Sequence, residues 1–165
     1  MTTVTLLHPG AMGAAVAAQA VKAGHEVLWV PEGRSESTHQ RAKETGAIAC
    51  NSLGEALERS EIVLSICPPQ VAEDVATTVA GHGFAGVYVE ANAINPQRMQ
   101  RIAEEIRPGT TVLDGAIFGR RPVASGRLAS TSLAKPRPWT RCSPCLRTPH
   151  CTSAVRAAAS APPPR

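Results

Sequence analysis

The stretch VTLLHPGAMG, residues 4–13, places an apolar run directly before a turn that contains two glycines. Small residues then dominate from Ala14 to Ala20, as in a helix that packs closely on a strand. A pyrophosphate group needs backbone N–H groups free of side chains and the positive end of a helix dipole. Gly10 and Gly13 supply the first, and a helix beginning near Met12 supplies the second. The stretch therefore predicts a phosphate-binding corner between a strand and a helix.

The spacing of this turn is that of G-x-G-x-x-G, with His8 in place of the first glycine. Any tight turn from strand to helix favours glycine, so the turn alone does not decide the fold. The context does, because Gly24 can end the helix and residues 25–30, HEVLWV, form a second apolar strand. Residues 4–30 are thus a β-α-β element of the dinucleotide-binding kind. The predicted corner consists of His8, Pro9, Gly10, Ala11, Met12 and Gly13.

Length and composition limit the class of protein. A chain of 165 residues holds one domain of ordinary size and not two. No apolar run approaches the ~18 residues of a membrane span, and the N-terminus lacks the pattern of a signal peptide. We therefore expect a cytoplasmic protein without a membrane partner, whose five cysteines are reduced.

The net charge of +4 averages two unlike parts of the chain. Residues 1–119 hold all 13 acidic residues and 8 of the 17 Lys and Arg, whereas the last 46 residues hold 9 basic residues and no acidic one. From Arg120 onward Arg, Pro, Ala and Ser dominate without helical or strand periodicity. We predict a folded domain over residues 3–119 and a low-complexity tail over residues 120–165.

Within residues 3–119 apolar runs alternate with helical patterns. Ser52 and Glu55 have the spacing of a capping box, and Asn95 can cap a helix that has Pro96 at its first position. Six strands and five helices in alternation predict an α/β fold with a Rossmann-type doubly wound parallel sheet. The strands are expected at 4–7, 25–30, 47–50, 62–67, 86–91 and 111–113; Val71, Val75 and Val79 are expected on one buried helix face, and Met99, Ile102 and Ile106 on another.

Ligands of such a sheet bind beyond the carboxyl ends of its strands, so the loop after the second strand bears on the cofactor. Glu32 stands 19 residues after Gly13, where an acidic residue would hold a ribose 2′-hydroxyl and select NAD. Arg34 and Ser35, aided by Ser37, would instead bind a 2′-phosphate, because a guanidinium offers a planar pair of donors. A solvated loop remains the third alternative. We favour NADP over NAD.

Several spaced stretches now resemble one family. They are Gly10-Ala-Met-Gly13, Ala23-Gly-His25-Glu-Val27, Cys67-Pro-Pro69, Glu90-Ala-Asn92-Ala-Ile-Asn-Pro96 and Leu113-Asp114-Gly-Ala-Ile-Phe-Gly119. In this order they resemble the β-hydroxyacid dehydrogenase superfamily, which includes 6-phosphogluconate and 3-hydroxyisobutyrate dehydrogenases and imine reductases. The resemblance covers residues 3–119, and the variants are most similar to a less characterised branch of NAD(P)-dependent oxidoreductases of the 6-phosphogluconate dehydrogenase type.

The resemblance implies further site residues. Cys67, Pro68 and Pro69 match the loop along the ribose and nicotinamide, although prolines also simply stop strands. Asn92 matches the segment near both nicotinamide and substrate. The start of the substrate-binding segment is matched by residues 114–119, among them Asp114, Gly115 and Gly119.

The resemblance fails at the catalytic lysine, which the family carries on a later helix. Lys135 is the sole lysine after Lys22 and Lys43, and the proline that follows it is incompatible with that helix. We therefore name no catalytic residue. The expected protein is the cofactor-binding domain of an oxidoreductase that transfers hydride between nicotinamide and a small hydroxy acid or imine, truncated and catalytically incomplete. A non-catalytic dinucleotide-binding module is the alternative.

The tail has two interpretations. We favour a segment that is disordered or read out of frame from a GC-rich gene. The other interpretation is a zinc knuckle that binds nucleic acid, formed by Cys142, Cys145, His150 and Cys151 among eight arginines. That ligand spacing fits no standard finger, and aromatic residues for stacking are lacking. We therefore predict no metal site and no nucleic-acid partner; a small-molecule substrate is expected only if a complete pocket forms.

Overall fold

The computed structural model describes residues 1–106, 109–115, 117–118, 132–133 and 137–138. Six parallel strands form a sheet in the order β3-β2-β1-β4-β5-β6, the order of the Rossmann fold. This confirms the predicted fold class. The strands are β1 (Thr3–Leu7), β2 (Glu26–Trp29), β3 (Ile48–Ala49), β4 (Ile62–Ser65), β5 (Val87–Glu90) and β6 (Thr111–Asp114).

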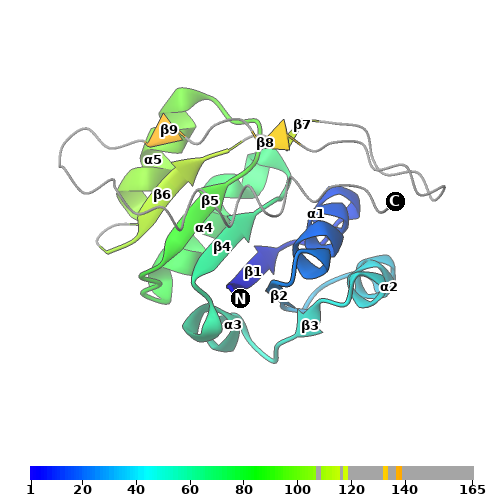
Figure 1. The fold of residues 1–165 in the computed structure, drawn as a ribbon. Coiled ribbons are helices and arrows are strands. Elements are labelled where there is room, and N and C mark those ends of the chain that lie inside the picture. Colours follow the sequence, from blue (N-terminus) through cyan, green and yellow to red (C-terminus); the bar gives the residue numbers. More distant parts are fainter. Residues whose placement is uncertain (107–108, 116, 119–131, 134–136, 139–165) are drawn as a thin grey trace.

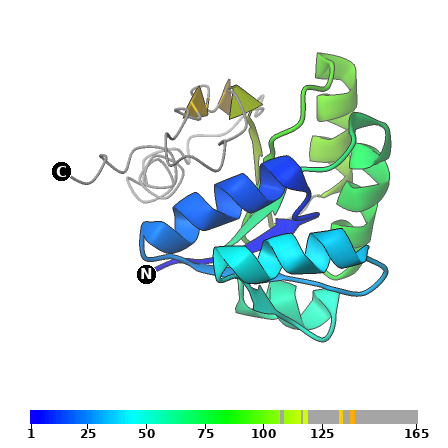
Figure 2. The same cartoon turned by 90° about the vertical axis from the view of Figure 1, so that its right-hand side faces the viewer.

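Helices cover both faces of this sheet (Figures 1 and 2). One face carries α1 (Ala11–Lys22) and α2 (Glu36–Thr45), which pack on each other. The other face carries α3 (Leu53–Arg59), α4 (Ala72–Gly81) and α5 (Pro96–Glu105), with the short 3-10 helix η1 (Pro69–Val71) leading into α4. This two-sided cover explains why apolar residues point to both faces of the sheet in most strands, for example in Val27–Trp29 and Ile62–Leu64.

Short antiparallel pairings follow β6. Strand β9 (Arg137–Pro138) pairs with β6, and β7 (Ile117–Phe118) pairs with β8 (Ser132–Leu133). The remainder of 120–165, including the four proposed zinc ligands and Lys135, lies outside the described residues. None of the described helices combines the length and the apolarity that crossing a membrane requires.

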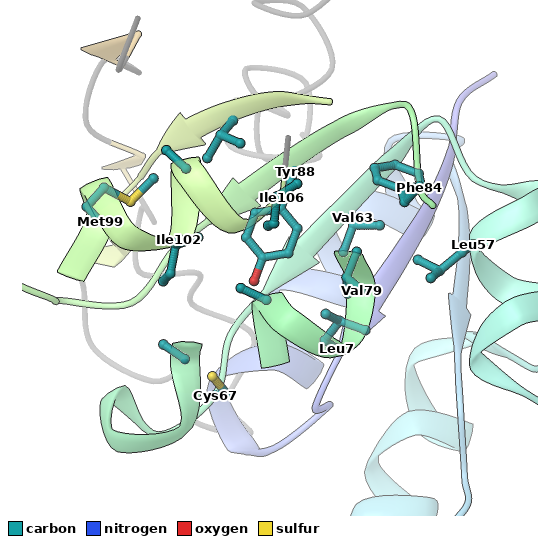
Figure 3. Close-up of a cluster of buried hydrophobic side chains, with 14 residues drawn as sticks. Leu7, Leu57, Val63, Cys67, Val79, Phe84, Tyr88, Met99, Ile102 and Ile106 are labelled. Carbon is teal, nitrogen blue, oxygen red and sulfur yellow. The ribbon is translucent and has the colours of Figure 1, made fainter. Parts of the chain in front are cut away.

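The largest apolar cluster lies between the sheet and helices α4 and α5 (Figure 3). The predicted core positions of α5 are confirmed, since Met99, Ile102 and Ile106 are each at most 3% exposed. The aromatic ring of Tyr88 lies among these side chains and is fully buried. At ~25 cal/mol per Å² of apolar surface, burial of such side chains is the main force holding the helices on the sheet.

Two helix starts agree with the sequence, and one helix face differs. The Asn95 side chain accepts from Arg98 N at 2.9 Å, and the Ser52 hydroxyl accepts from Glu55 N at 3.1 Å. The prediction for Val71 is wrong. It is 37% exposed and belongs to η1, because α4 begins one residue later, whereas Val79 in α4 is buried as predicted.

The register of the sheet aligns the last residues of four strands. Leu7 pairs with Ser65, Ser65 with Glu90, and Glu90 with Asp114. Adjacent strands are ~4.8 Å apart, so the segments that follow these four residues meet along one edge of the sheet. These segments contain most of the site residues predicted from the sequence.

Candidate functional site

The glycine turn between β1 and α1 combines a left-handed residue, a close approach of helix to strand and an open glycine. His8, at the position of the first glycine of the motif, has φ 68°, a left-handed conformation that favours glycine. A Cβ added at Gly13 would lie 2.6 Å from the backbone oxygen of His8, so only glycine allows α1 to approach β1 this closely. A Cβ at Gly10 would meet nothing within 4 Å. The open side of Gly10 is thus where a ligand can reach the backbone.

Helix α1 begins at this open side without a side-chain cap. Gly10 is its N-cap and supplies no hydrogen bond from a side chain to the first turn. Ala11 and Met12 are exposed, whereas Pro9 is fully buried. The first N–H groups of a helix have no partner within the helix and carry its positive dipole end. The backbone here, at Gly10, Ala11 and Met12, could accept a pyrophosphate. Pro9, in contrast, is buried in the interior.

The loop after β2 presents positive charge and hydroxyl groups. Arg34 is half-buried, and its Nε has no hydrogen-bond partner among the described residues. Ser35 is the N-cap of α2, and its Oγ lies 3.1 Å from the Oγ of Ser37. Glu32 is exposed in the same loop. The guanidinium of Arg34 and the hydroxyls can together donate to an anion, as the NADP interpretation requires.

Arg41 adds a cation that the sequence analysis missed. Its Nη2 donates to Ser37 Oγ at 3.2 Å, which places this guanidinium beside the hydroxyl cluster. The spacing of four residues from Ser37, within one predicted helix, was the signal that could have identified it.

Electrostatic interactions join three separate loops. Burial, and next the charge of Arg34, lower the pKa of His8 to about 4. Burial also lowers the pKa of Arg34, and Cys67 acts on it in the opposite direction. His8 follows β1, Arg34 belongs to the loop after β2, and Cys67 follows β4, so the fold brings these predicted residues into one electrostatic environment. The imidazole of His8 is therefore neutral at pH 7, and its buried Nδ1 has no partner within the described residues.

The lowered pKa of His8 predicts acid sensitivity. Between about pH 6.5 and 4 the unfolded chain binds a proton at His8 that the folded chain does not, so stability is full above the unfolded pKa and falls as the pH drops toward 4. We expect His8→Gly to reduce this loss, and also to raise stability at pH 7 by about 1 kcal/mol because φ 68° suits glycine. Thermal unfolding at pH 7.5 and 4.5 measures both effects.

His82→Gln is the matched control, because it also removes one histidine, but one that is exposed at the end of α4. It should leave the acid-induced loss of stability as in the wild type. An acid-induced loss of stability that is equal in the wild type and in His8→Gly would contradict the assignment of the sensitivity to His8.

A second part of the candidate site lies at the ends of β4 and β5. The Cys67 backbone N–H donates to Asn92 Oδ1 at 2.9 Å, and Asn92 Nδ2 lies 3.3 Å from Cys67 Sγ. Burial raises the pKa of the Cys67 thiol, which is therefore not a poised nucleophile. Pro68 and Pro69 are exposed beyond it. The exposed prolines, rather than the buried thiol, are the part of this loop that a ligand can contact.

Asn92 is only 8% exposed, and its carboxamide is turned inward. Its partners include Glu90, a buried carboxyl that the sequence analysis did not single out as a site residue. A glutamate at the end of a strand such as Val87–Glu90 is ordinarily exposed. The absence of other charged residues near it in the sequence was the one indication that it is buried. Burial raises the pKa of Glu90.

The predicted substrate segment is described in part. Gly115 is buried, and its N–H donates to the backbone oxygen of Glu90 at 2.7 Å. Asp114 ends β6 and is half-buried. Gly119 lies outside the described residues. Within the described ranges no group of three or more His, Cys, Asp or Glu is placed to hold a metal ion.

A family profile described as NADP oxidoreductase, coenzyme F420-dependent, matches residues 3–89, more than half of the chain. The chain belongs to this family. The match contains the glycine turn, the loop after β2 and the Cys67–Pro69 loop.

Individual proteins similar to this NADP oxidoreductase family member include a 3-hydroxyisobutyrate dehydrogenase, in line with the family that the sequence resembles. An uncharacterised 28.5 kDa protein of Methanothermus fervidus is 33% identical over 110 residues, which cover 64% of this chain and 43% of that protein. The structure of a protein of unknown function, reported to be similar in structure to 3-hydroxyacid dehydrogenases, is 29% identical in sequence with a TM-score of 0.66. The match covers 72% of this chain and 44% of that protein's chain. The 3-hydroxyisobutyrate dehydrogenase of Mycobacterium tuberculosis is 26% identical with a TM-score of 0.64, covering 72% and 41%. The chain thus spans less than half the length of these relatives, and it is an NAD(P)-binding Rossmann domain of the 3-hydroxyacid dehydrogenase type.

Proposed function

We propose that this domain binds a dinucleotide across the carboxyl edge of its sheet, with the pyrophosphate on the glycine turn. The observation that carries the proposal is the open side of Gly10 at the uncapped start of α1. The adenosine half would lie toward Arg34 and Ser35, and the nicotinamide half toward the Cys67–Pro69 loop. When bound, the nicotinamide supplies the hydride, and the described residues bind and orient it.

NADP is the cofactor that the loop after β2 supports best. Arg34 has a buried Nε without a partner in the described part of the chain, and Arg41 stands beside the hydroxyl of Ser37 in the first turn of α2. A 2′-phosphate would satisfy these donors, whereas a ribose 2′-hydroxyl would need only an acceptor such as Glu32.

We expect Arg34→Gln to weaken NADPH binding by about 10- to 100-fold and to leave NADH binding nearly unchanged, because a charge-assisted contact to phosphate is lost. Titration of each cofactor by its fluorescence measures the ratio of the two dissociation constants. The matched control is Arg101→Gln, whose guanidinium is exposed and bound to Glu73 at 2.8 Å. Equal weakening of NADH and NADPH would contradict the assignment of Arg34 to the 2′-phosphate.

The reaction proposed for the complete site is hydride transfer between nicotinamide and a small hydroxy acid or imine. The lysines of the described residues, Lys22 and Lys43, lie in the last turns of α1 and α2, away from the carboxyl edge of the sheet. This observation favours the second candidate function, a module that binds the cofactor without turning over a substrate.

Titration of the full chain with NADPH and NADH, followed by a turnover assay with a panel of small hydroxy acids and imines, tests both proposals. Saturable binding without turnover supports the binding module, and turnover supports the oxidoreductase. Absence of binding to either cofactor contradicts both.

A further inference from the structure

Glu90 is a fully buried carboxyl at the end of β5. None of the ion pairs found among the described residues involves it. Its Oε1 accepts from Asn92 N at 3.1 Å and also from Asn92 Nδ2, and its Oε2 accepts from the Tyr88 hydroxyl at 3.3 Å. A buried acidic side chain is costly unless its oxygens are satisfied, and here neutral donors satisfy them.

These contacts continue from β5 to the loop after β4. Asn92 Nδ2 faces Glu90, so the opposite end of the same carboxamide, Oδ1, accepts from Cys67 N. Glu90 Oε1 already accepts from the Asn92 backbone N–H and so acts as an acceptor here, and a backbone N–H is a donor. The two partners therefore admit one orientation of the Asn92 carboxamide and exclude its 180° flip.

We propose that Glu90 is a positioning residue that acts through Asn92 to fix the Cys67–Pro69 loop. The link to nicotinamide rests on the function proposed above, whereas the link to the loop is a property of the chain without ligand. Pro68 and Pro69 have no N–H group, so the Cys67 N–H is the backbone donor that ties this stretch to Asn92 in the segment after β5. The loop is consequently anchored by a side-chain hydrogen bond whose orientation depends on Glu90.

Two readouts separate positioning from general stability. Amide hydrogen exchange of Cys67 in the ligand-free protein reports whether its N–H stays bonded to Asn92 Oδ1. NADPH titration reports what the loss of this bond does to cofactor binding. We expect Glu90→Leu, which keeps the apolar volume and removes the acceptors, to speed exchange at Cys67 and to weaken NADPH binding, each by about tenfold. Glu90→Gln retains an acceptor for Asn92 and is expected to keep both values near the wild type.

The matched control is Thr5→Val, which removes another fully buried polar group, one bound to Ala56 O at 3.1 Å and away from this loop. It should leave Cys67 exchange unchanged relative to other amides. If Glu90→Leu does not fold, Glu90→Met, which has similar length and no carboxyl oxygen, removes the same acceptors and is expected to reproduce both effects.

Unchanged exchange at Cys67 in the leucine variant overturns the proposal, and faster exchange without weaker NADPH binding overturns its link to nicotinamide. Faster exchange by one common factor across all strands also overturns the proposal, because the role would then be merely structural. A wild-type chain that binds no NADPH overturns the proposed function and with it the link to nicotinamide. Cys67 exchange in the variants still decides whether Glu90 fixes the Cys67–Pro69 loop.

Discussion

Replacing Gly10 with aspartate is expected to abolish dinucleotide binding while leaving the domain at least as stable as the wild type. The backbone at Gly10 has φ −66° and ψ −169°, which any residue adopts, and an added Cβ meets nothing within 4 Å. Aspartate is a preferred N-cap and can accept from the first turn of α1, which no side chain now caps. The same carboxylate would stand where a pyrophosphate must lie.

The expected loss of affinity for NADPH is at least about 100-fold, because like charges a few ångströms apart near a protein surface repel by several kcal/mol. Thermal unfolding and NADPH titration of the same sample give the two quantities. Gly10→Asn is the matched control, since asparagine caps equally well without a charge and should weaken binding less. An aspartate variant that binds NADPH like the wild type would exclude the glycine turn as the phosphate site.

The sequence predicted the sheet because each element carried its own local signal. Apolar runs marked the strands, and Ser52 and Asn95 marked helix starts that the structure contains. The error at Val71 came from including it in the four-residue period of Val75 and Val79, whereas α4 begins only at Ala72 and Val71 belongs to the preceding 3-10 helix. Local patterns therefore identified the elements but did not fix where a period starts.

The site was harder to predict because its residues come together only through the register of the strands. His8 could be placed at the first glycine position from spacing alone, and its φ of 68° agrees with that placement. The neighbourhood of His8, Arg34 and Cys67 depends on which strands are adjacent, which one sequence does not state. Glu90 was missed for a similar reason, since its burial depends on Tyr88 and Asn92 as hydrogen-bond donors and not on any motif.

The second large effect is expected at Gly13, where alanine should both destabilise the domain and weaken cofactor binding. The added Cβ would lie 2.6 Å from His8 O, a backbone atom that cannot rotate away. Either β1 or α1 must shift, and such overpacking costs about 1–3 kcal/mol. That is a large share of the ~5–15 kcal/mol that stabilises a domain, so we expect a clear loss in urea unfolding.

A displaced α1 also moves the N–H groups that would bind the pyrophosphate, so the binding loss should exceed what instability alone explains. Gly86→Ala separates the two effects. A Cβ at Gly86 would clash with Glu61 O and with the Phe84 ring, at the opposite edge of the sheet from the glycine turn. Measured well below the unfolding temperature of both variants, NADPH affinity should fall in Gly13→Ala and stay near the wild type in Gly86→Ala. Equal affinities in the two variants would mean that the approach of α1 to β1 serves packing alone, and that the phosphate site does not depend on it.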